Sequence, residues 1–324
     1  MNSSPQVSVV IPTIRRPDIV VRACKTALCQ TFSDLEVIVV IDGPDEATRA
    51  SLTCIQDVRL RVVPLEQNHG LAAVRNIGVS HARGRWIAFL DDDDEWLEHK
   101  IEMQVKAAEN LGGERIFMAS EYLDKGPNFD RVLPWRLPGP EEPISEYLFC
   151  RRGATGKSGL VQPSTYFASA TLLREVPFKA KLRPHEDFDW LLRAAKVADR
   201  PFMVVPGPLS IYHNEHTQDR ESTSGNFDFY WRYVHENRDL FTPEAFSFYI
   251  AAFCTPAASA SPDRLRLWWK VLQGIFEGRA TMRCLVMVAG FALLSVERRR
   301  QMRQILSRLS GSPAPAGRME GLRN

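Results

Sequence analysis

Residues 86–96 read Trp-Ile-Ala-Phe-Leu-Asp-Asp-Asp-Asp-Glu-Trp, an apolar run that ends in four consecutive aspartates. The apolar run is typical of a buried strand, with the aspartates at its carboxyl end. Open α/β sheets bind ligands at that end of their strands, and hard divalent cations prefer oxygen ligands such as carboxylates. Four adjacent like charges are costly to bury without a cation. The stretch therefore predicts a cation-dependent binding site, and the alternative is a solvated acidic turn.

The first 120 residues alternate Val/Ile-rich runs with helical patterns. Two of these runs, VSVVI at 7–11 and VIVVI at 37–41, are continuous rather than alternating in hydrophobicity, as in parallel strands covered on both faces. Strands are predicted at Val7–Ile11, Leu35–Ile41, Arg59–Pro64, Trp86–Leu90 and Arg115–Ala119, and helices near 17–30, 45–56, 70–83 and 96–111. This repetition predicts an α/β fold with a doubly wound, mainly parallel sheet flanked by helices.

The remainder of the chain is less regular. Residues 121–165 are rich in Pro and Gly, which predicts loops around an acceptor cleft or a poorly conforming subdomain. Further elements are predicted as a strand near 164–170, a helix near 186–198, strands near 202–212 and a mainly helical stretch over 243–309. The predicted organisation is a catalytic domain over 1–215 with halves at 1–120 and 121–215, a mainly helical C-terminal region over 216–310, and a disordered tail over 311–324.

Composition and charge are those of a globular protein with a basic end. Of the 324 residues, 25% are charged and 44% are hydrophobic. Residues 262–309 carry ten Lys/Arg against three Asp/Glu, so the preceding 261 residues are mildly acidic although the formal net charge is +2. The six cysteines form no CxxC pair, and Cys284–Val296, the longest apolar stretch, is short for a bilayer span. With no secretory signal at the N-terminus, these features predict a cytoplasmic protein.

Two other predicted strands also end in polar groups. Ile11-Pro12-Thr13 ends the first strand, and Ile41-Asp42-Gly43 ends the second. In a doubly wound sheet these ends can line one crevice together with the aspartates. Asp42 could bind a base or a ribose, and the backbone near Pro12 and Thr13 could pack against the base. The alternative for Asp42 is an Asp-Gly turn.

Residues 68–76, Asn-His-Gly-Leu-Ala-Ala-Val-Arg-Asn, follow the third strand and open a helix. Arg75 falls on the second turn of this helix, where it could meet a phosphate or an acidic neighbour. The stretch is not a dinucleotide-binding GxGxxG motif, and the chain contains no GxxxxGK[ST] loop. Both absences weaken the dehydrogenase and P-loop nucleoside triphosphatase interpretations.

Five sequence motifs follow one another along the chain. They are VSVVIPTIRRPD (7–18), LEVIVVIDG (35–43), NHGLAAVRNIG (68–78), GRWIAFLDDDDEWL (84–97) and HEDFDWLLR (185–193). With them, residues 7–215 strongly resemble the family 2 glycosyltransferases of the GT-A fold. Such enzymes move a sugar from a nucleotide-diphospho-sugar donor to an acceptor hydroxyl with inversion at the anomeric carbon.

The resemblance also assigns roles at the donor site. The DxD motif of the family maps to Asp91–Asp93, so that Asp92 would meet the ribose or the sugar and Asp93 would hold Mg²⁺ or Mn²⁺. Because four aspartates are adjacent, Asp91 and Asp94 remain alternates for these contacts. Pro12, Thr13, Asp42, Asn68, Arg75 and Asp91 are placed with Asp92 among the nucleotide-sugar-binding residues.

An inverting displacement also needs a base to take the proton of the acceptor hydroxyl. In similar enzymes this base is the Asp of an ED pair, which here is Asp187 beside Glu186. On a helix, Glu186 and Asp189 share a face, whereas Asp187 and Asp189 do not, so only part of the cluster can face the cleft. The alternative is an acidic helix N-terminus that is stabilised by the helix dipole.

Other parts of the sequence also bear on the function. His213, after the last predicted strand, is a candidate metal or phosphate ligand by resemblance, against a surface or packing histidine. Gly159–Ser164 is expected near the acceptor and the sugar. No Q-x-x-R-W motif, which marks processive synthases, follows the ED pair, so single-sugar transfer is favoured. The resemblance implies surface polysaccharide or glycolipid biosynthesis with a glycan, glycolipid or lipid-linked acceptor, and slightly favours a UDP-sugar donor.

The basic segment 265–309 contains the pair Trp268-Trp269 and apolar stripes. These features are typical of a helix that contacts a membrane surface, or of a helical hairpin that packs on the catalytic domain. Nucleic-acid binding is disfavoured because the basic residues form no known nucleic-acid-binding module and are expected to lack interleaved exposed aromatics. Two other functions remain open, a sugar-phosphate nucleotidyltransferase and a non-catalytic module that binds a nucleotide sugar or a glycan.

Overall fold

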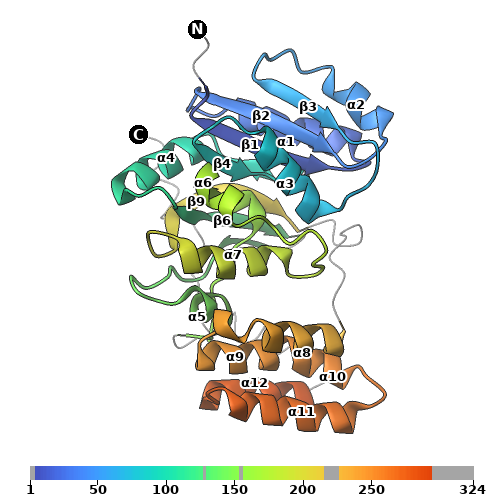
Figure 1. Ribbon diagram of the computed structural model, residues 1–324, viewed down its shortest axis with the longest axis vertical. Coiled ribbons are helices and arrows are strands. Elements are labelled where there is room, and N and C mark those ends of the chain that lie inside the picture. Colours follow the sequence, from blue (N-terminus) through green and yellow to red (C-terminus); the bar gives the residue numbers. More distant parts are fainter. Residues whose placement is uncertain (1–3, 127–128, 153–155, 215–225, 294–324) are drawn as a thin grey trace. The chain divides into compact units, whose positions relative to one another are not determined.

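The computed structural model describes residues 4–126, 129–152, 156–214 and 226–293 of the chain. The chain divides into two compact units, Met1–Pro140 with Leu160–Ser222, and Glu141–Gly159 with Thr223–Asn324 (Figure 1). The segment 141–159, which lies within the predicted half at 121–215, therefore belongs to the second unit.

The first unit is built on one sheet, which has nine strands within the described residues. The strands are β1 (Val7–Thr13), β2 (Leu35–Ile41), β3 (Leu60–Pro64), β4 (Trp86–Phe89), β5 (Glu95–Trp96), β6 (Phe117–Gly126), β7 (Phe129–Leu133), β8 (Phe167–Ser169) and β9 (Met203–His213). Their order is β3-β2-β1-β4-β8-β6-β9-β5, and β7 pairs with β6. The α/β fold class predicted from the sequence is confirmed.

The direction of the strands changes along this sheet. The strands β3, β2, β1 and β4 are mutually parallel, as the alternation of strands and helices predicts. Beyond them, β8 runs antiparallel to both β4 and β6, whereas β6 and β9 are parallel. The sheet is thus parallel in its N-terminal half and mixed in the other half.

Helices flank the sheet of the first unit. They are α1 (Pro17–Leu28), α2 (Glu46–Leu52), α3 (Leu71–His81), α4 (Lys100–Leu111), α6 (Ala170–Glu175) and α7 (Glu186–Val197), with a 3₁₀ turn at Pro163–Thr165. The predicted helix near 96–111 begins only at Lys100, because Glu95 and Trp96 pair with β9 instead. Pro17 occupies the first turn of α1, where its missing N–H costs nothing.

Alternate residues of the central strands face opposite layers of helices. Val7, Val9 and Ile11 of β1 belong to one buried cluster with residues of α1 and α4. Val10 points the other way, where a Cβ atom on Gly78 of α3 would clash with its side chain. Glycine at position 78 therefore allows α3 to approach β1 closely.

Within the described residues, the regular elements of the second unit are helices, apart from an isolated bridge between Arg152 and Lys157. Its elements are α5 (Ile144–Phe149), α8 (Phe227–Glu236), a 3₁₀ turn at Arg238–Leu240, α9 (Pro243–Tyr249), a π-helical turn at Ile250–Cys254, α10 (Thr255–Ser259), α11 (Arg264–Glu277) and α12 (Met282–Leu293). Aromatic rings fill its core, with Tyr249 in contact with Phe149, Phe241 and Phe253. The predicted helical stretch is confirmed as far as residue 293.

Some predictions fall outside the described residues. They concern the end of the helical stretch at 294–309 and the tail at 311–324. Among the helices that the structure describes, none is both long enough and apolar enough to cross a membrane.

Candidate active site

Three parallel strands bring the predicted site residues to one edge of the sheet. Because β1 lies between β2 and β4, the residues that follow these strands are neighbours in space. The Asp42 N–H donates to the Thr13 carbonyl at 2.9 Å, and Thr13 Oγ1 donates to Asp92 Oδ2 at 2.6 Å. The structure therefore brings Thr13, Asp42 and the aspartate cluster together, as the sequence predicts.

Asp92 is the buried centre of the cluster. Its second oxygen, Oδ1, accepts a hydrogen bond from Arg16 Nη1 at 2.8 Å, and the same nitrogen lies 3.1 Å from Asp93 Oδ2. Burial raises the pKa of Asp92 to about 6, although Thr13 and Arg16 act in the opposite direction. The sequence analysis overlooked Arg16, and the signal for it was the Arg15-Arg16 pair just after a strand end that was expected to bind the ligand.

Asp94 faces the interior instead of the crevice. Its Oδ2 accepts a hydrogen bond from Ser164 Oγ at 2.5 Å, and Ser164 Oγ also accepts one from the Asp91 N–H at 3.0 Å. Trp96 Nε1 donates to the Ser164 carbonyl at 2.8 Å, which ties the same loop to β5. Asp94 thus has a structural partner, whereas the side chains of Asp91 and Asp93 are both partly exposed.

Asp42 organises the loop that precedes α3. Its two carboxylate oxygens accept the backbone N–H groups of His69 at 2.7 Å and Gly70 at 2.9 Å. Gly43 and Gly70 both have positive φ angles, at 106° and 85°, which glycine adopts without strain. Asp42 therefore holds the loop that contains Asn68 against the ligand edge of the sheet, and its contact with a base stays a prediction.

Arg75 connects the aspartate cluster to the predicted base segment. Its side chain is only 1% exposed, and Nη2 donates to Asp91 Oδ1 at 2.9 Å. Its Nη1 lies 3.6 Å from Glu186 Oε1, and the guanidinium carbon lies 5.7 Å from the centre of the Phe178 ring. Of the two partners considered for Arg75, the structure shows the acidic neighbours.

Asp187 lies in the first turn of α7 and is half-buried. Burial and the adjacent charge of Glu186 raise its pKa to about 6, against the opposing effect of Arg75. Asp189, by contrast, is fully buried between Lys179 Nζ at 2.8 Å and Arg193 Nε at 2.7 Å. Asp189 is thus held as a structural ion pair, while Glu186 contacts Arg75.

His213 lies at the end of β9, beside the short strand β5. Its Nε2 is 2.6 Å from Glu95 Oε1, and Arg22 Nε is 3.5 Å from the same oxygen. Arg22 Nη2 also donates to the Asp93 carbonyl at 2.9 Å. His213 is therefore linked to the aspartate cluster through two side chains, and its role as a metal ligand stays a prediction.

The chemistry of the aspartate cluster fits a hard divalent cation in part. Its donors are carboxylate oxygens, which Mg²⁺ and Mn²⁺ accept. Among the residues that the structure describes, however, no three Asp, Glu, His or Cys side chains are arranged to hold a metal by themselves. A cation at this site would therefore take one or two carboxylates, such as that of Asp93, and would complete its ligands with phosphate oxygens and water.

This fold is of the GT-A type. The family model described as "Glycosyl transferase family 2" matches residues 8–158. This match covers less than half of the chain, and over residues 8–158 it agrees with the resemblance read from the motifs.

Individual known proteins are also similar to this chain. The chain is 27% identical over 244 residues to the "Putative colanic acid biosynthesis glycosyl transferase WcaA" of Escherichia coli K12, covering 74% of this chain and 84% of that one. It is 33% identical over 99 residues to the Escherichia coli "UDP-Glc:alpha-D-GlcNAc-diphosphoundecaprenol beta-1,3-glucosyltransferase WfgD", covering 31% and 39% of the two chains. The crystal structure of Staphylococcus aureus TarS 1–349 with UDP-GlcNAc shares the fold, with a TM-score of 0.57, 18% identity, and coverage of 89% of this chain and 91% of that one.

Proposed function

We propose that this glycosyltransferase moves one sugar from a nucleotide-diphospho-sugar to an acceptor hydroxyl, with inversion at the anomeric carbon. The observation that carries the proposal is the position of Arg75. This buried guanidinium contacts Asp91 after β4 and Glu186 at the start of α7. The donor-side aspartates and the segment that contains Asp187 therefore lie on either side of one side chain. An inverting displacement requires such an arrangement, because the leaving group and the base act on opposite faces of the sugar.

In the proposed reaction Asp187 is the general base. The acceptor oxygen forms a bond to the anomeric carbon, its proton passes to a carboxylate oxygen of Asp187, and the bond to the diphosphate breaks. A raised pKa suits this role, because a carboxylate with a pKa near 6 takes a proton more readily than an ordinary aspartate. Glu186 contributes to that raised pKa through its neighbouring charge.

On the donor side, the residues around Asp92 would bind the nucleotide and the diphosphate. Thr13 and Arg16 hold the two oxygens of Asp92 in fixed directions. Asp93, with Mg²⁺ or Mn²⁺ when the ion is bound, would stabilise the negative charge that develops on the departing diphosphate. We place the base and the ribose near Pro12, Asp42 and Asn68.

The proposed setting is surface polysaccharide or glycolipid assembly at the cytoplasmic face of a membrane. WcaA is named for colanic acid biosynthesis, and WfgD for transfer from UDP-Glc to a sugar on diphosphoundecaprenol. These names support a UDP-sugar donor and a lipid-linked acceptor for this chain.

The test is a screen of UDP-, GDP- and dTDP-sugars for binding and slow hydrolysis, with and without Mn²⁺ or Mg²⁺. Wild type is expected to release the nucleoside diphosphate only with the metal. Asp93→Ala should abolish this release, and Asp187→Asn should keep donor binding but lose turnover by about 100-fold or more. Asp34→Asn is the matched control, because Asp34 is exposed and precedes β2 at the opposite edge of the sheet.

Three outcomes would contradict the proposal. The first is that no nucleotide sugar binds in a metal-dependent way. The second is pyrophosphate release from a nucleoside triphosphate and a sugar phosphate, which would indicate a nucleotidyltransferase. The third is donor binding without transfer when lipid-linked acceptors are supplied, which would indicate a binding module.

A further inference from the structure

Helix α11 carries a stripe of large apolar side chains that face solvent. Leu265, Trp269 and Phe276 are 84%, 65% and 66% exposed, and Leu272, between them, is also exposed. Their spacing of four, three and four residues places all four on one face of the helix. We call this face the α11 stripe. Contiguous exposed apolar surface of this kind marks an interaction site in soluble proteins.

The other side of α11 anchors the helix in its unit, which fixes the direction of the stripe. Val271, Gly274 and Ile275 are buried. A Cβ atom on Gly274 would lie 2.7 Å from Ile250 Cδ1 and 3.0 Å from Trp231, so the backbone of α11 packs closely on its neighbours there. The α11 stripe therefore points away from the core of the second unit and is not simply its loosely packed interior.

Helix α12 adds further exposed apolar surface to the same unit. Met282 and Val286, one turn apart, are 75% and 64% exposed. In Figure 1, α11 and α12 lie on the side of α8 and α9 that is away from α5. Exposed apolar side chains thus occur on both helices of this outer layer.

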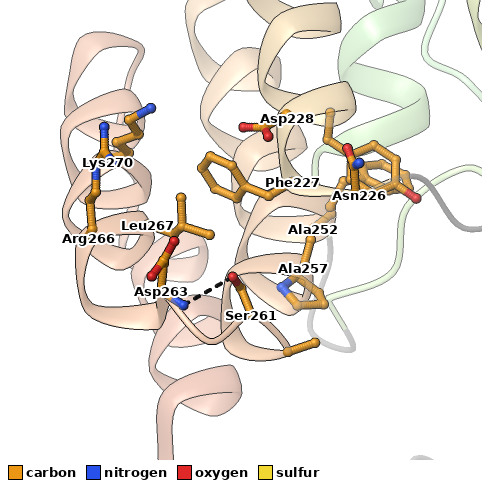
Figure 2. Close-up of a pocket in the computed structure, with 14 residues that line it drawn as sticks. Asn226, Phe227, Asp228, Ala252, Ala257, Ser261, Asp263, Arg266, Leu267 and Lys270 are labelled. Atoms are coloured by element: carbon orange, nitrogen blue, oxygen red, sulfur yellow. Dashed lines mark hydrogen bonds between the residues drawn. The ribbon is translucent and has the colours of Figure 1, made fainter.

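Basic residues are frequent along α11 and at the start of α12. Arg264 and Arg266 are exposed on α11, and Arg279 and Arg283 follow between α11 and the first turn of α12, whereas the acidic residues of this part of the unit are Asp263 and Glu277. Figure 2 shows Arg266 and Lys270, one helical turn apart, at a cavity of about 690 Å³ between α8, α10 and α11. Asp228 and Asp263 also line this cavity, so we assign it no ligand of its own.

We propose that the α11 stripe binds the surface of a membrane that contains anionic lipid. Tryptophan favours the boundary between headgroups and acyl chains, and arginine or lysine beside an apolar stripe adds attraction to anionic headgroups. Charge argues against the other occupants. A second copy would bring the same basic face to the stripe, and the chain after residue 293 is itself basic, with Arg298-Arg299-Arg300.

This inference extends the lipid-linked acceptor of the proposed function. Its test needs neither donor nor acceptor, so its failure can be distinguished from failure of the transferase proposal. The full chain is mixed with phosphatidylcholine vesicles, with or without phosphatidylglycerol, and the vesicles are floated through a density gradient. Wild type is expected to float with the anionic vesicles, and to do so less as salt is added.

The double variant Trp269→Ser/Phe276→Ser should reduce flotation by about tenfold or more, because it removes two large apolar side chains from the contact. Arg264→Gln/Arg266→Gln should weaken binding to anionic vesicles and flatten its dependence on salt. Val58→Ser is the matched control, since Val58 is a fully exposed apolar residue of the first unit. Circular dichroism checks that each variant is folded.

Wild type that does not bind anionic vesicles would overturn the inference, as would equal flotation of the Trp269→Ser/Phe276→Ser variant. A concentration-dependent dimer that this variant abolishes, without vesicle binding, would assign the stripe to a second copy. Vesicle binding that is seen only after residues 294–324 are deleted would assign the stripe to the chain's own C-terminal segment.

Discussion

Arg75 shows how one side chain can organise a site. Its guanidinium is buried with Asp91 on one side and Glu186 on the other, and these two residues lie on segments that are far apart in the sequence. Removing the positive charge would leave two partly buried carboxylates without their partner, which is far more costly than losing an exposed ion pair.

We therefore expect Arg75→Met to lower the free energy of unfolding by about 3 kcal/mol. Arg75→Lys keeps the charge but loses the planar fork that reaches both carboxylates, so its loss should be smaller. Urea unfolding of the two variants measures the difference. Equal stability of Arg75→Met and wild type would show that the cluster contributes nothing to folding.

The raised pKa of Asp187 predicts how kcat depends on pH. This pKa is raised to about 6 by burial and by the charge of Glu186. Because a general base acts in its deprotonated form, kcat at saturating donor should fall as the pH drops through about 6 and should level off above about pH 7. Steady-state kinetics from pH 5 to about pH 8 would show this profile.

A control separates Asp187 from Asp92, whose pKa also lies near 6. Donor affinity is measured over the same pH range, because protonation of Asp92 should change donor binding. Arg75 lowers the pKa of Asp187, so replacing Arg75 is not expected to lower this pKa further. The midpoint of the kcat profile of a folded Arg75→Lys or Arg75→Met variant should therefore not move to lower pH. A profile that stays flat from pH 5 to about pH 8 would contradict the assignment of Asp187 as the base.

At the scale of elements, the contact between α3 and β1 depends on the absence of a side chain at Gly78. A Cβ atom there would clash with Val10 of β1. We expect Gly78→Ala to reduce stability by about 1–2 kcal/mol, since overpacking outweighs the better helix propensity of alanine.

The double variant Val10→Ala/Gly78→Ala tests the cause, because the smaller side chain at position 10 makes room for the new methyl group. Its loss of stability should be less than the sum of the two single losses. Strict additivity in thermal or urea unfolding would mean that the two positions do not interact.

Elements with regular apolar patterns were predictable, and elements stabilised by distant polar partners were not. The β1, β2 and β4 runs are mostly apolar and fully buried, and they form strands close to the predicted bounds. By contrast, β6 continues to Gly126, seven residues beyond its predicted end, through Glu121 and Asp124. These acids are buried because Glu121 accepts the Gly207 N–H at 2.6 Å and Asp124 pairs with Arg131 at 2.7 Å, and local hydrophobicity carries no sign of either contact.

At the scale of the whole molecule, the two units are expected to respond to different ligands. The predicted donor-binding residues all lie in the first unit, and the α11 stripe lies in the second. In hydrogen–deuterium exchange, a nucleoside diphosphate with Mn²⁺ should protect peptides around Thr13, Asp42 and Asp92 and leave α11 unchanged. Anionic vesicles should protect α11 and leave those peptides unchanged.

Asp93→Ala and Trp269→Ser/Phe276→Ser serve as reciprocal controls, and each should remove only one of the two protection patterns. Protection of α11 by the nucleotide in the absence of lipid would contradict this separation of roles.

The sequence by itself determined the fold class, the parallel strands of the N-terminal half, the resemblance to family 2 glycosyltransferases and the edge of the sheet at which the aspartates lie. These properties follow from local patterns, because apolar periodicity and motif order are carried by neighbouring residues. Only the tertiary structure determined the role of each charged group within the site. Thr13 meets Asp92 across 79 residues and Ser164 meets Asp94 across 70, so four adjacent and chemically identical side chains acquire different partners. Such long-range contacts set the burial and the partner charges of each carboxylate: they hold Asp94 and Asp189 in place as structural groups, and burial raises the pKa of Asp187.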